Sequence, residues 1–309
     1  MATLLYTHRV CIDHHTGDRH PESPDRLRSV QAVLAGESFD GLVRREAPEA
    51  SREQLSLAHE PEYIDAVLAA IPKTGHRHLD PDTVVSPASG EAARRGAGAV
   101  VAAVDAIMTE QGAENAFCAV RPPGHHAERA RSMGFCLFNN VAVGALHGRA
   151  EHGLRRAAVV DFDVHHGNGT QHMFENDEDL FYASSHQAPF YPGTGSENET
   201  GVGNIFNAPL AAGSGSAEFR AAYEDRILPG LRRFDPDILF TSAGFDAHAD
   251  DPLAQLRLTE DDYRWITREL LAVAKECCDG RIVSALEGGY NLGALARSTE
   301  AHVLELMGA

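Results

Sequence analysis

Short apolar runs alternate along the chain with longer stretches in which apolar residues recur at helical spacing. The apolar runs lie near residues 3–6, 42–45, 116–120, 157–161, 179–184, 203–208, 237–242 and 281–286. Helical periodicity marks residues 26–34, 61–70, 89–108, 141–152, 217–233 and 259–277. Strands that alternate with helices favour a parallel sheet covered by helices on both faces. The pattern therefore predicts an α/β fold.

No linker divides the chain, so we expect residues 1–309 to form a single domain. Two stretches, 72–90 and 186–204, are rich in Pro, Gly, Ser, Thr, Asp and His. They are predicted to be long loops, and loops of such length within a compact domain are often functional. The pairs Ser23-Pro24 and Thr259-Glu260 are typical of helix starts.

Composition narrows the classes of partner. The formal net charge is −18, which argues against nucleic-acid binding because that needs a basic face. The acidic surface suits cationic partners, although solubility alone would explain it. No stretch is long and apolar enough for a membrane span, and the N-terminus does not have the pattern of a signal peptide. Five cysteines without framework spacing indicate reduced thiols and a cytoplasmic protein. A homo-oligomer is left open.

Polar residues gather where one predicted strand ends. The run Asp161-Phe162-Asp163-Val164-His165-His166 follows the apolar residues 157–160. Asp163 and His165 are two residues apart, so in extended backbone their side chains leave on the same side. A carboxylate and an imidazole that converge in this way form half of a zinc or iron site.

Three other predicted strand ends carry reactive groups. His125 and His126 stand on a Pro-Gly turn after residues 116–120, and their pKa range suits proton transfer, although a surface pair is the simpler interpretation. Asp246 follows residues 237–242; a single aspartate there is often a helix cap. Tyr290 follows Gly288-Gly289, where a tyrosine often serves only packing.

Together these segments resemble the zinc-dependent histone deacetylases, in the branch of class II and bacterial deacetylase-like amidohydrolases. The resemblance runs from His20-Pro21-Glu22 to Tyr290-Asn291 and keeps the family's motif order. The motifs are Arg-Pro-Pro-Gly-His-His (121–126), Gly-Phe-Cys (134–136), Asp-x-Asp-x-His-His-Gly-Asn-Gly-Thr (161–170), Tyr-Pro-Gly-Thr-Gly (191–195) and Glu-Gly-Gly-Tyr (287–290). The resemblance implies the arginase-deacetylase fold, with an eight-stranded parallel sheet.

The resemblance also implies the roles of individual residues. Asp163, His165 and Asp246 match the zinc ligands; such a set would also accept Fe²⁺ or Co²⁺. By resemblance His126 is the main general base and acid, and His125 assists electrostatically. Their matched partners are Asp161 for the first histidine and Asn168 for the second. Tyr290 matches the tyrosine that stabilises the oxyanion.

Channel and cation residues are implied in the same way. Gly134, Phe135 and Tyr191 match the walls of a narrow acyl-lysine channel, while Asp82 is interpreted mainly as a turn residue. Leu253 stands where the polyamine-selective relative has glutamate. Structural K⁺ is implied at an inner site formed by Asp161, Asp163, His165, Ser184 and Ser185. A weaker match at Phe174, Asp177, Leu180 and Asn204 implies an outer site.

The expected activity is zinc-dependent removal of acetyl, or another acyl group, from lysine side chains of proteins or peptides. Acetylpolyamine amidohydrolase activity on a small acylated amine is the main alternative, against which Leu253 argues. A zinc-dependent esterase or thioesterase acting on a small acylated metabolite, and a catalytically weak acyl-lysine binding module, are further alternatives.

Overall fold

The structure, a computed structural model, describes residues 2–308, so the two end residues of the predicted domain lie outside the described part. Its centre is an eight-stranded sheet in the order β2-β1-β5-β10-β9-β6-β7-β8, in which every neighbouring pair is parallel. The strands are β1 (Ala2–Thr7), β2 (Val43–Glu46), β5 (Ala113–Cys118), β6 (Ala157–Asp161), β7 (Leu180–Gln187), β8 (Ile205–Leu210), β9 (Ile238–Ala243) and β10 (Ile282–Leu286). All eight predicted strands are confirmed.

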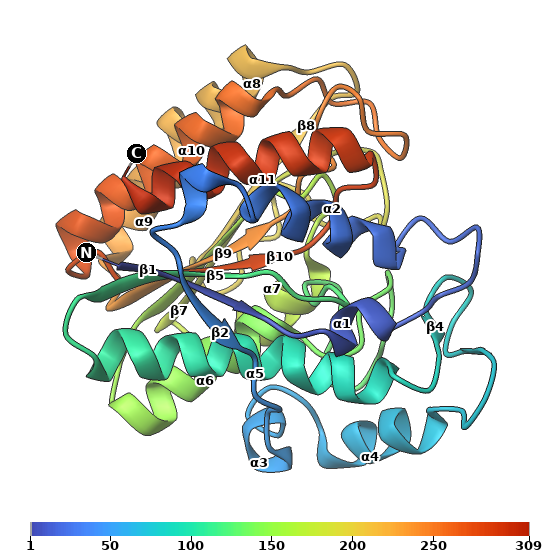
Figure 1. The fold of residues 1–309 in the computed structure, drawn as a ribbon. Helices are drawn as coiled ribbons and strands as arrows, with labels where there is room; N and C mark the ends of the chain where they lie inside the picture. Colours follow the sequence, from blue (N-terminus) through green and yellow to red (C-terminus); the bar gives the residue numbers. More distant parts are fainter. Residues whose placement is uncertain (1, 309) are drawn as a thin grey trace.

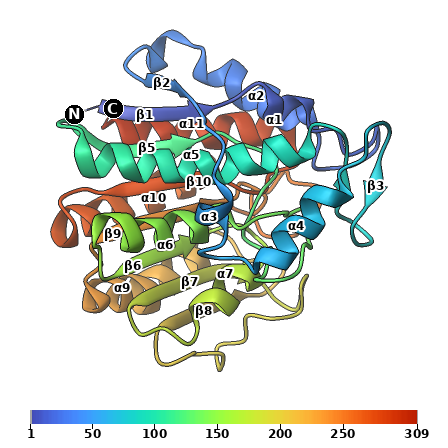
Figure 2. The ribbon, with the colours of Figure 1, turned by 90° about the horizontal axis from the view of Figure 1, so that it is seen from below.

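Helices cover both faces of this sheet (Figures 1 and 2). One face carries α5 (Ser89–Thr109) and α6 (Asn140–His152), with α3 (Arg52–Leu55) and α4 (Pro61–Ala70) outside them. The other carries α2 (Pro24–Leu34), α9 (Leu228–Phe234), α10 (Glu260–Cys277) and α11 (Leu292–Met307). The remaining helices are α1 (Val10–Asp13), α7 (Asn168–Phe174) and α8 (Ser216–Ala222), with a 3₁₀ turn at Glu37–Phe39. Among residues 2–308 we find no helix of the length and apolarity that a membrane crossing needs.

Burial explains why the central strands could be recognised in the sequence. Every residue of β6, β9 and β10 is buried, because helices cover both faces of a parallel sheet. Such strands read as continuous apolar runs rather than as alternating patterns.

The order of the strands positions the site. The four reactive segments follow β5, β6, β9 and β10, and these four strands are neighbours at the centre of the sheet. Parallel strands end at the same edge, so the four loops meet there. Asp161 pairs with Ser242 and Ala243 pairs with Leu286, which sets the loops after β6, β9 and β10 at the same level.

Some predicted elements differ in detail. The stretch 72–90 contains a small antiparallel hairpin of β3 (Arg77–His78) and β4 (Val84–Val85), and β7 extends into the second predicted loop as far as Gln187. The helix predicted over 217–233 is interrupted by a π-helical segment, Tyr223–Ile227. Pro229 follows this segment and has no N–H to continue the regular ladder, which accounts for the interruption.

Candidate active site

Asp163, His165 and Asp246 converge at the edge of the sheet where β6 and β9 end. Each offers one ligand atom, and the three atoms lie within 4.8 Å of one another. His165 Nδ1 lies 3.0 Å from Asp163 Oδ1 and 3.2 Å from Asp246 Oδ2. All three residues are buried. Two carboxylates and one imidazole in this arrangement can hold a divalent metal ion and leave a coordination position open.

Backbone donors orient both carboxylates. The Gly288 N–H donates to Asp163 Oδ2 at 2.8 Å, and the Val164 N–H donates to Asp246 Oδ1 at 2.8 Å. The other oxygen of Asp246, Oδ2, is buried without a hydrogen-bond partner among the described residues. Because an orphaned buried carboxylate oxygen is costly, a cation at this point would satisfy it. The donor set therefore fits a divalent metal.

Two glycines make room for this cluster. A Cβ atom at Gly244 would overlap the Asp163 carboxylate, and one at Gly288 would overlap Asp246 Oδ2. Position 288 thus requires glycine, because the carboxylates approach its Cα atom closely. Gly289 has φ of +122°, a conformation that side chains strongly disfavour.

The two adjacent histidines each have a partner on one ring nitrogen. His125 Nδ1 lies 3.0 Å from Asp161 Oδ2, and His126 Nδ1 lies 2.8 Å from Asn168 Oδ1. The two rings are 4.0 Å apart between centroids, and the ring of His126 is 5.9 Å from that of His165. The structure therefore brings together the two histidines predicted to handle protons, their partners and the three candidate metal ligands.

Local charges separate the two histidines. Burial would lower the pKa of His125, but Asp161 and Asp163 outweigh it and raise this pKa to about 10. Burial, together with the neighbouring His125, holds the pKa of His126 well below its usual range. Asn168 carries no charge that could offset these effects. The surroundings thus make His125 the more basic and His126 the less basic of the two histidines.

Tyr290 follows the glycine pair and is half-buried. Its ring lies edge-on to that of Phe135, at 5.9 Å between centroids, and the Arg26 guanidinium lies 4.9 Å from the Tyr290 ring centroid. The Asp251 carboxylate accepts hydrogen bonds from the backbone N–H groups of Tyr290 and Asn291, at 2.7 and 3.2 Å. Asp251 therefore fixes the backbone that carries the tyrosine.

Comparison with known proteins identifies the group to which the chain belongs. A family model described as "Histone deacetylase domain" matches residues 20–306. The chain belongs to the histone deacetylase family. It is therefore an amidohydrolase of the deacetylase type, and its family implies a divalent metal and an acetylated substrate. This confirms the resemblance that the motifs indicated.

Three relatives show how far the likeness extends. The chain is 38% identical to the "Histone deacetylase-like amidohydrolase" of Pseudomonas aeruginosa, covering 88% of this chain and 73% of that protein. It is 37% identical to "Type-2 histone deacetylase 2" of Dictyostelium discoideum over 99% of this chain, but spans only 21% of that protein. The crystal structure of the HDA15 HD domain has a TM-score of 0.94 and 35% identity, covering 100% of this chain and 90% of that one.

Aromatic rings surround the metal cluster of this deacetylase-family chain. The Tyr191 ring lies 5.2 Å from that of His126 and 6.1 Å from that of His165, and Tyr191 is 38% exposed. Phe135, which has φ of +69°, contacts Tyr290 from another loop. Gly134 lies against His126, whose ring a Cβ atom would overlap. Phe190, which the sequence analysis did not single out, stacks on His165 at 5.3 Å.

The loops around these rings also position Leu253 and Asp82. The Leu253 N–H donates to Asp251 Oδ1 at 3.0 Å, so the same carboxylate holds Leu253 and Tyr290. The turn at residues 80–83 is made by Asp80, whose Oδ1 accepts the N–H groups of Asp82 and Thr83. The Asp82 carboxylate instead lines a groove of about 620 Å³ beside Tyr191.

The predicted cation sites have different surroundings. At the inner one, Asp161 pairs with Ser184 across the sheet, and the Tyr223 hydroxyl lies 3.1 Å from Ser185 Oγ and 3.5 Å from the Asp161 carbonyl oxygen. At the outer one, the side-chain amide of Asn204 donates to three carbonyls, those of Phe174, Asp177 and Leu180. Its oxygen accepts the Val202 N–H, which fixes the amide orientation. Asn204 thus faces these carbonyls as a donor rather than joining them as an oxygen ligand.

Buried charges that the sequence analysis did not single out support the site from behind. Glu22, Arg26 and Arg121 are fully buried; the Glu22 carboxylate accepts from Arg26 Nη1 at 2.9 Å and from both Nε and Nη2 of Arg121. Arg26 also donates to the carbonyls of Glu287 and Gly289. The Glu287 carboxylate accepts the N–H groups of Gly124 and His125. Glu22 and Glu287 belong to quoted motifs, but their contacts span distant segments.

Proposed function

We propose that this chain is a zinc-dependent amidohydrolase that removes acetyl, or another acyl group, from lysine side chains of proteins or peptides, with residues 1–309 acting as one deacetylase domain. The observation that carries the proposal is the convergence of Asp163, His165 and Asp246 beside the His125–His126 pair. Zinc would polarise the amide carbonyl and acidify the attacking water. We also propose structural K⁺ at the inner site.

The two histidines would have different roles in the reaction. His126, paired with the neutral Asn168, would accept the proton of the attacking water and pass it to the leaving amine. His125, paired with the Asp161 carboxylate, would remain charged and stabilise the negative charge that develops beside it. Tyr290 would donate its hydroxyl to the oxyanion, and Phe135 and Tyr191 would flank the alkyl chain of the acylated lysine.

One observation favours a second candidate, a small cationic acylated amine. Asp80 and Asp82 both line the groove beside Tyr191, and carboxylates at a channel mouth attract a distant ammonium group. Leu253, an apolar side chain near Tyr290, offers no such attraction.

A substrate panel with metal analysis tests both candidates. Purified enzyme would be assayed on acetyl-lysine peptides, acetylspermidine, acetylputrescine and an acyl thioester. We expect the highest kcat/KM on peptides; a preference for the polyamines would favour the second candidate, and activity on the thioester alone would refute both. Asp246→Ala should lose the catalytic zinc together with the activity, because two ligands do not hold an open tetrahedral site. Full activity in that variant would contradict the metal assignment.

A further inference from the structure

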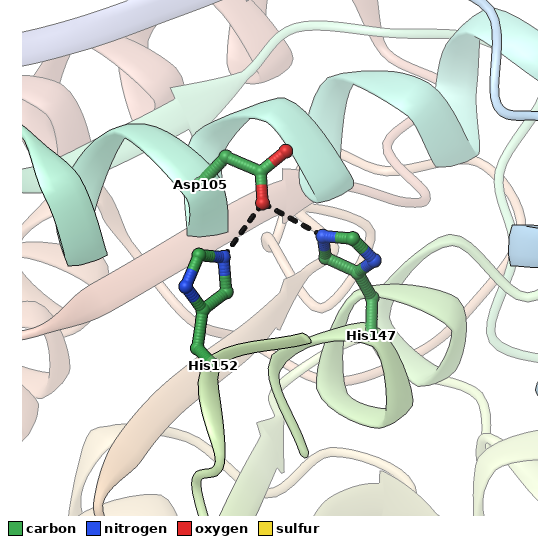
Figure 3. A group of neighbouring side chains, drawn as sticks. All are labelled: Asp105, His147 and His152. Atoms are coloured by element: carbon green, nitrogen blue, oxygen red, sulfur yellow. Dashed lines mark hydrogen bonds and ion pairs between the residues drawn. The ribbon is translucent and has the colours of Figure 1, made fainter. Parts of the chain in front are cut away.

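A second cluster of metal-ligand type lies between helices α5 and α6, outside the site described above. Asp105 stands near the end of α5, and His147 and His152 stand in the last part of α6. Figure 3 shows both imidazoles pointing toward one oxygen of the Asp105 carboxylate. Each Nε2 lies 2.7 Å from that Oδ1 atom, and the three candidate ligand atoms lie within 4.8 Å of one another.

Close packing of the two helices holds these groups in place. Gly144, on α6, has no room for a Cβ atom because one would overlap the side chain of Val100 on α5. A Cβ at Gly148, one turn further, would lie 3.1 Å from Leu154 and 3.4 Å from Val104. Since glycines let two helix backbones approach closely, Asp105 meets His147 across the interface without a long side chain. The cluster is therefore formed before any ligand binds.

The cluster is remote from the catalytic cluster. Helix α6 begins at Asn140, whose side chain donates to the Pro122 carbonyl in the Arg-Pro-Pro-Gly-His-His segment. His152 is twelve residues further along, which corresponds to about 18 Å of helix. No residue of the proposed catalytic set contacts the cluster among the described interactions. Its chemistry thus requires an explanation of its own.

The three side chains differ in exposure, so one side of the cluster is buried and the other is open to solvent. The His147 side chain is 5% exposed, that of His152 16% and that of Asp105 48%. The open side faces a groove of about 480 Å³ that is also lined by Glu53, Glu151, Ser51, Gln54 and Leu57. Among the described residues that line this groove, none is lysine or arginine. A cation that enters would meet three carboxylates and no positive side chain.

We propose that Asp105, His147 and His152 form a second metal site, which binds one divalent ion of the Zn²⁺, Ni²⁺ or Co²⁺ class. Two imidazoles and one carboxylate suit these ions rather than Mg²⁺ or Ca²⁺, which take oxygen ligands. Tetrahedral zinc holds its ligand atoms roughly 3.3 Å apart, so each Nε2 need move outward from Oδ1 by only about 0.6 Å. Glu151, one helical turn after His147 and exposed, can supply the fourth ligand.

The surroundings of His147 indicate a moderate affinity. When Nε2 binds a metal, the ring proton must sit on Nδ1, and this atom of His147 is buried without a hydrogen-bond partner among the described residues. Outer-shell partners of ligating histidines typically contribute about 10- to 100-fold in affinity. The site should therefore fill at raised zinc and empty before the catalytic cluster does. Without metal, the hydrogen bonds from the two imidazoles to Asp105 would link helices α5 and α6.

Metal counting in matched variants tests the proposal. Tag-free protein would be dialysed to equilibrium against buffers of rising zinc concentration, and the zinc bound per chain would be measured by plasma mass spectrometry against the buffer outside the membrane. We expect two zinc ions per chain in the wild type and one in both Asp105→Asn and His152→Gln. The control His78→Gln, which removes an exposed histidine outside the cluster, should keep two. His147 is left intact, because its burial makes a folding defect the expected result of replacing it.

Removing the catalytic ligand separates the two sites. Asp246→Ala should keep one zinc ion, and Asp246→Ala/His152→Gln should keep none. Added zinc should raise the Tm of Asp246→Ala but not that of the double variant, since a ligand stabilises only the state that binds it. A single zinc ion in the wild type would overturn the proposal. So would a second ion that survives in both Asp105→Asn and His152→Gln.

Discussion

Replacing Asp251 by asparagine should slow the reaction without removing the metal. Asp251 is buried, and its Oδ2 atom accepts the N–H groups of Tyr290 and Asn291 while Oδ1 accepts that of Leu253. Asparagine has nearly the same shape but only one acceptor oxygen. If that oxygen keeps the Leu253 N–H, the new NH₂ group faces the two N–H groups of the tyrosine loop. Donors then oppose donors, and the loop must move.

The size of the effect follows from the bonds that are lost. Hydrogen bonds to a charged group contribute roughly 1.5–3 kcal/mol each, so we expect a loss of about 2–4 kcal/mol in stability after relaxation. A displacement of about 1 Å at a catalytic group can cost roughly 100-fold in rate. Complete removal of the hydroxyl in Tyr290→Phe should cost about 100- to 1000-fold. For Asp251→Asn we therefore expect kcat to fall about 10- to 100-fold.

The assay separates positioning from folding. Turnover of an acetyl-lysine peptide would be measured at a temperature where circular dichroism shows each variant to be folded, with zinc content determined on the same samples. The loss should appear mainly in kcat, because the tyrosine hydroxyl acts on the transition state more than on bound substrate. Asp250→Asn is the matched control. The Asp250 side chain, next to Asp251 in the sequence, is 59% exposed and pairs with Arg297 at the surface, where ion pairs contribute little to stability.

A double-variant cycle decides whether Asp251 acts through the tyrosine. If it does, adding Asp251→Asn to Tyr290→Phe should cause little further loss, since the displaced hydroxyl is already gone. A full additional 10- to 100-fold loss in that background would refute the reasoning. It would then point to a direct influence of Asp251 on the metal cluster.

Three other buried or channel side chains can be tested in the same direct way. Glu22→Gln should destabilise the protein by roughly 3–5 kcal/mol in urea unfolding, because Arg26 and Arg121 lose their buried counter-charge; unchanged stability would contradict this. Burial lowers the pKa of His302 to about 3 in the folded protein, whereas a histidine in the unfolded chain has a pKa of about 6.5. The stability that neutral His302 contributes is thus complete above pH 6.5 and is lost as the pH falls toward 3. The difference in unfolding free energy between the wild type and His302→Gln should therefore shrink between these two pH values. A difference that does not depend on pH would contradict this prediction. A hydroxamate on a slender aliphatic linker should inhibit turnover, and Tyr191→Ala should weaken this inhibition; turnover untouched by excess hydroxamate would mean that the metal site or the channel is misassigned.

The fold could be predicted where the physics is local. Buried parallel strands read as apolar runs, and so all eight were found, together with six helical stretches. The helices α7 and α11 were not predicted. Their order in the sheet could not be derived from the pattern, because β10 lies between β5 and β9 through connections that leave no local signal. The π-helical segment at Tyr223–Ile227 was missed because apolar residues at helical spacing do not distinguish such a segment from an ordinary α-helix.

The candidate site divides in the same way. Asp163 and His165 were visible because they are two residues apart at a strand end, and His125 and His126 because they are adjacent. Asp251 was not singled out, since its bonds to Tyr290 and Asn291 span about forty residues. The predicted outer cation site rested mostly on backbone oxygens and included Asn204, and only the structure shows that the Asn204 side-chain amide donates to the other carbonyls. Supporting contacts between distant segments have no spacing that a sequence pattern can reveal.

The two histidine–carboxylate clusters show what separates a catalytic metal centre from a simpler one. At the first cluster, backbone N–H groups hold both oxygens of Asp163 and one oxygen of Asp246, and glycines at 244 and 288 leave room for the groups to converge. The Asp105 carboxylate, by contrast, is half-exposed, and among the described residues only the two imidazoles donate to it. In the first cluster, backbone hydrogen bonds hold the carboxylates in place and Asp246 Oδ2 has no hydrogen-bond partner, so a metal ion can bind there without displacing one. In the second cluster, a metal ion would have to replace the hydrogen bonds between the imidazoles and Asp105. That exchange is why we assign catalysis to the strand ends and only reversible binding to the helices.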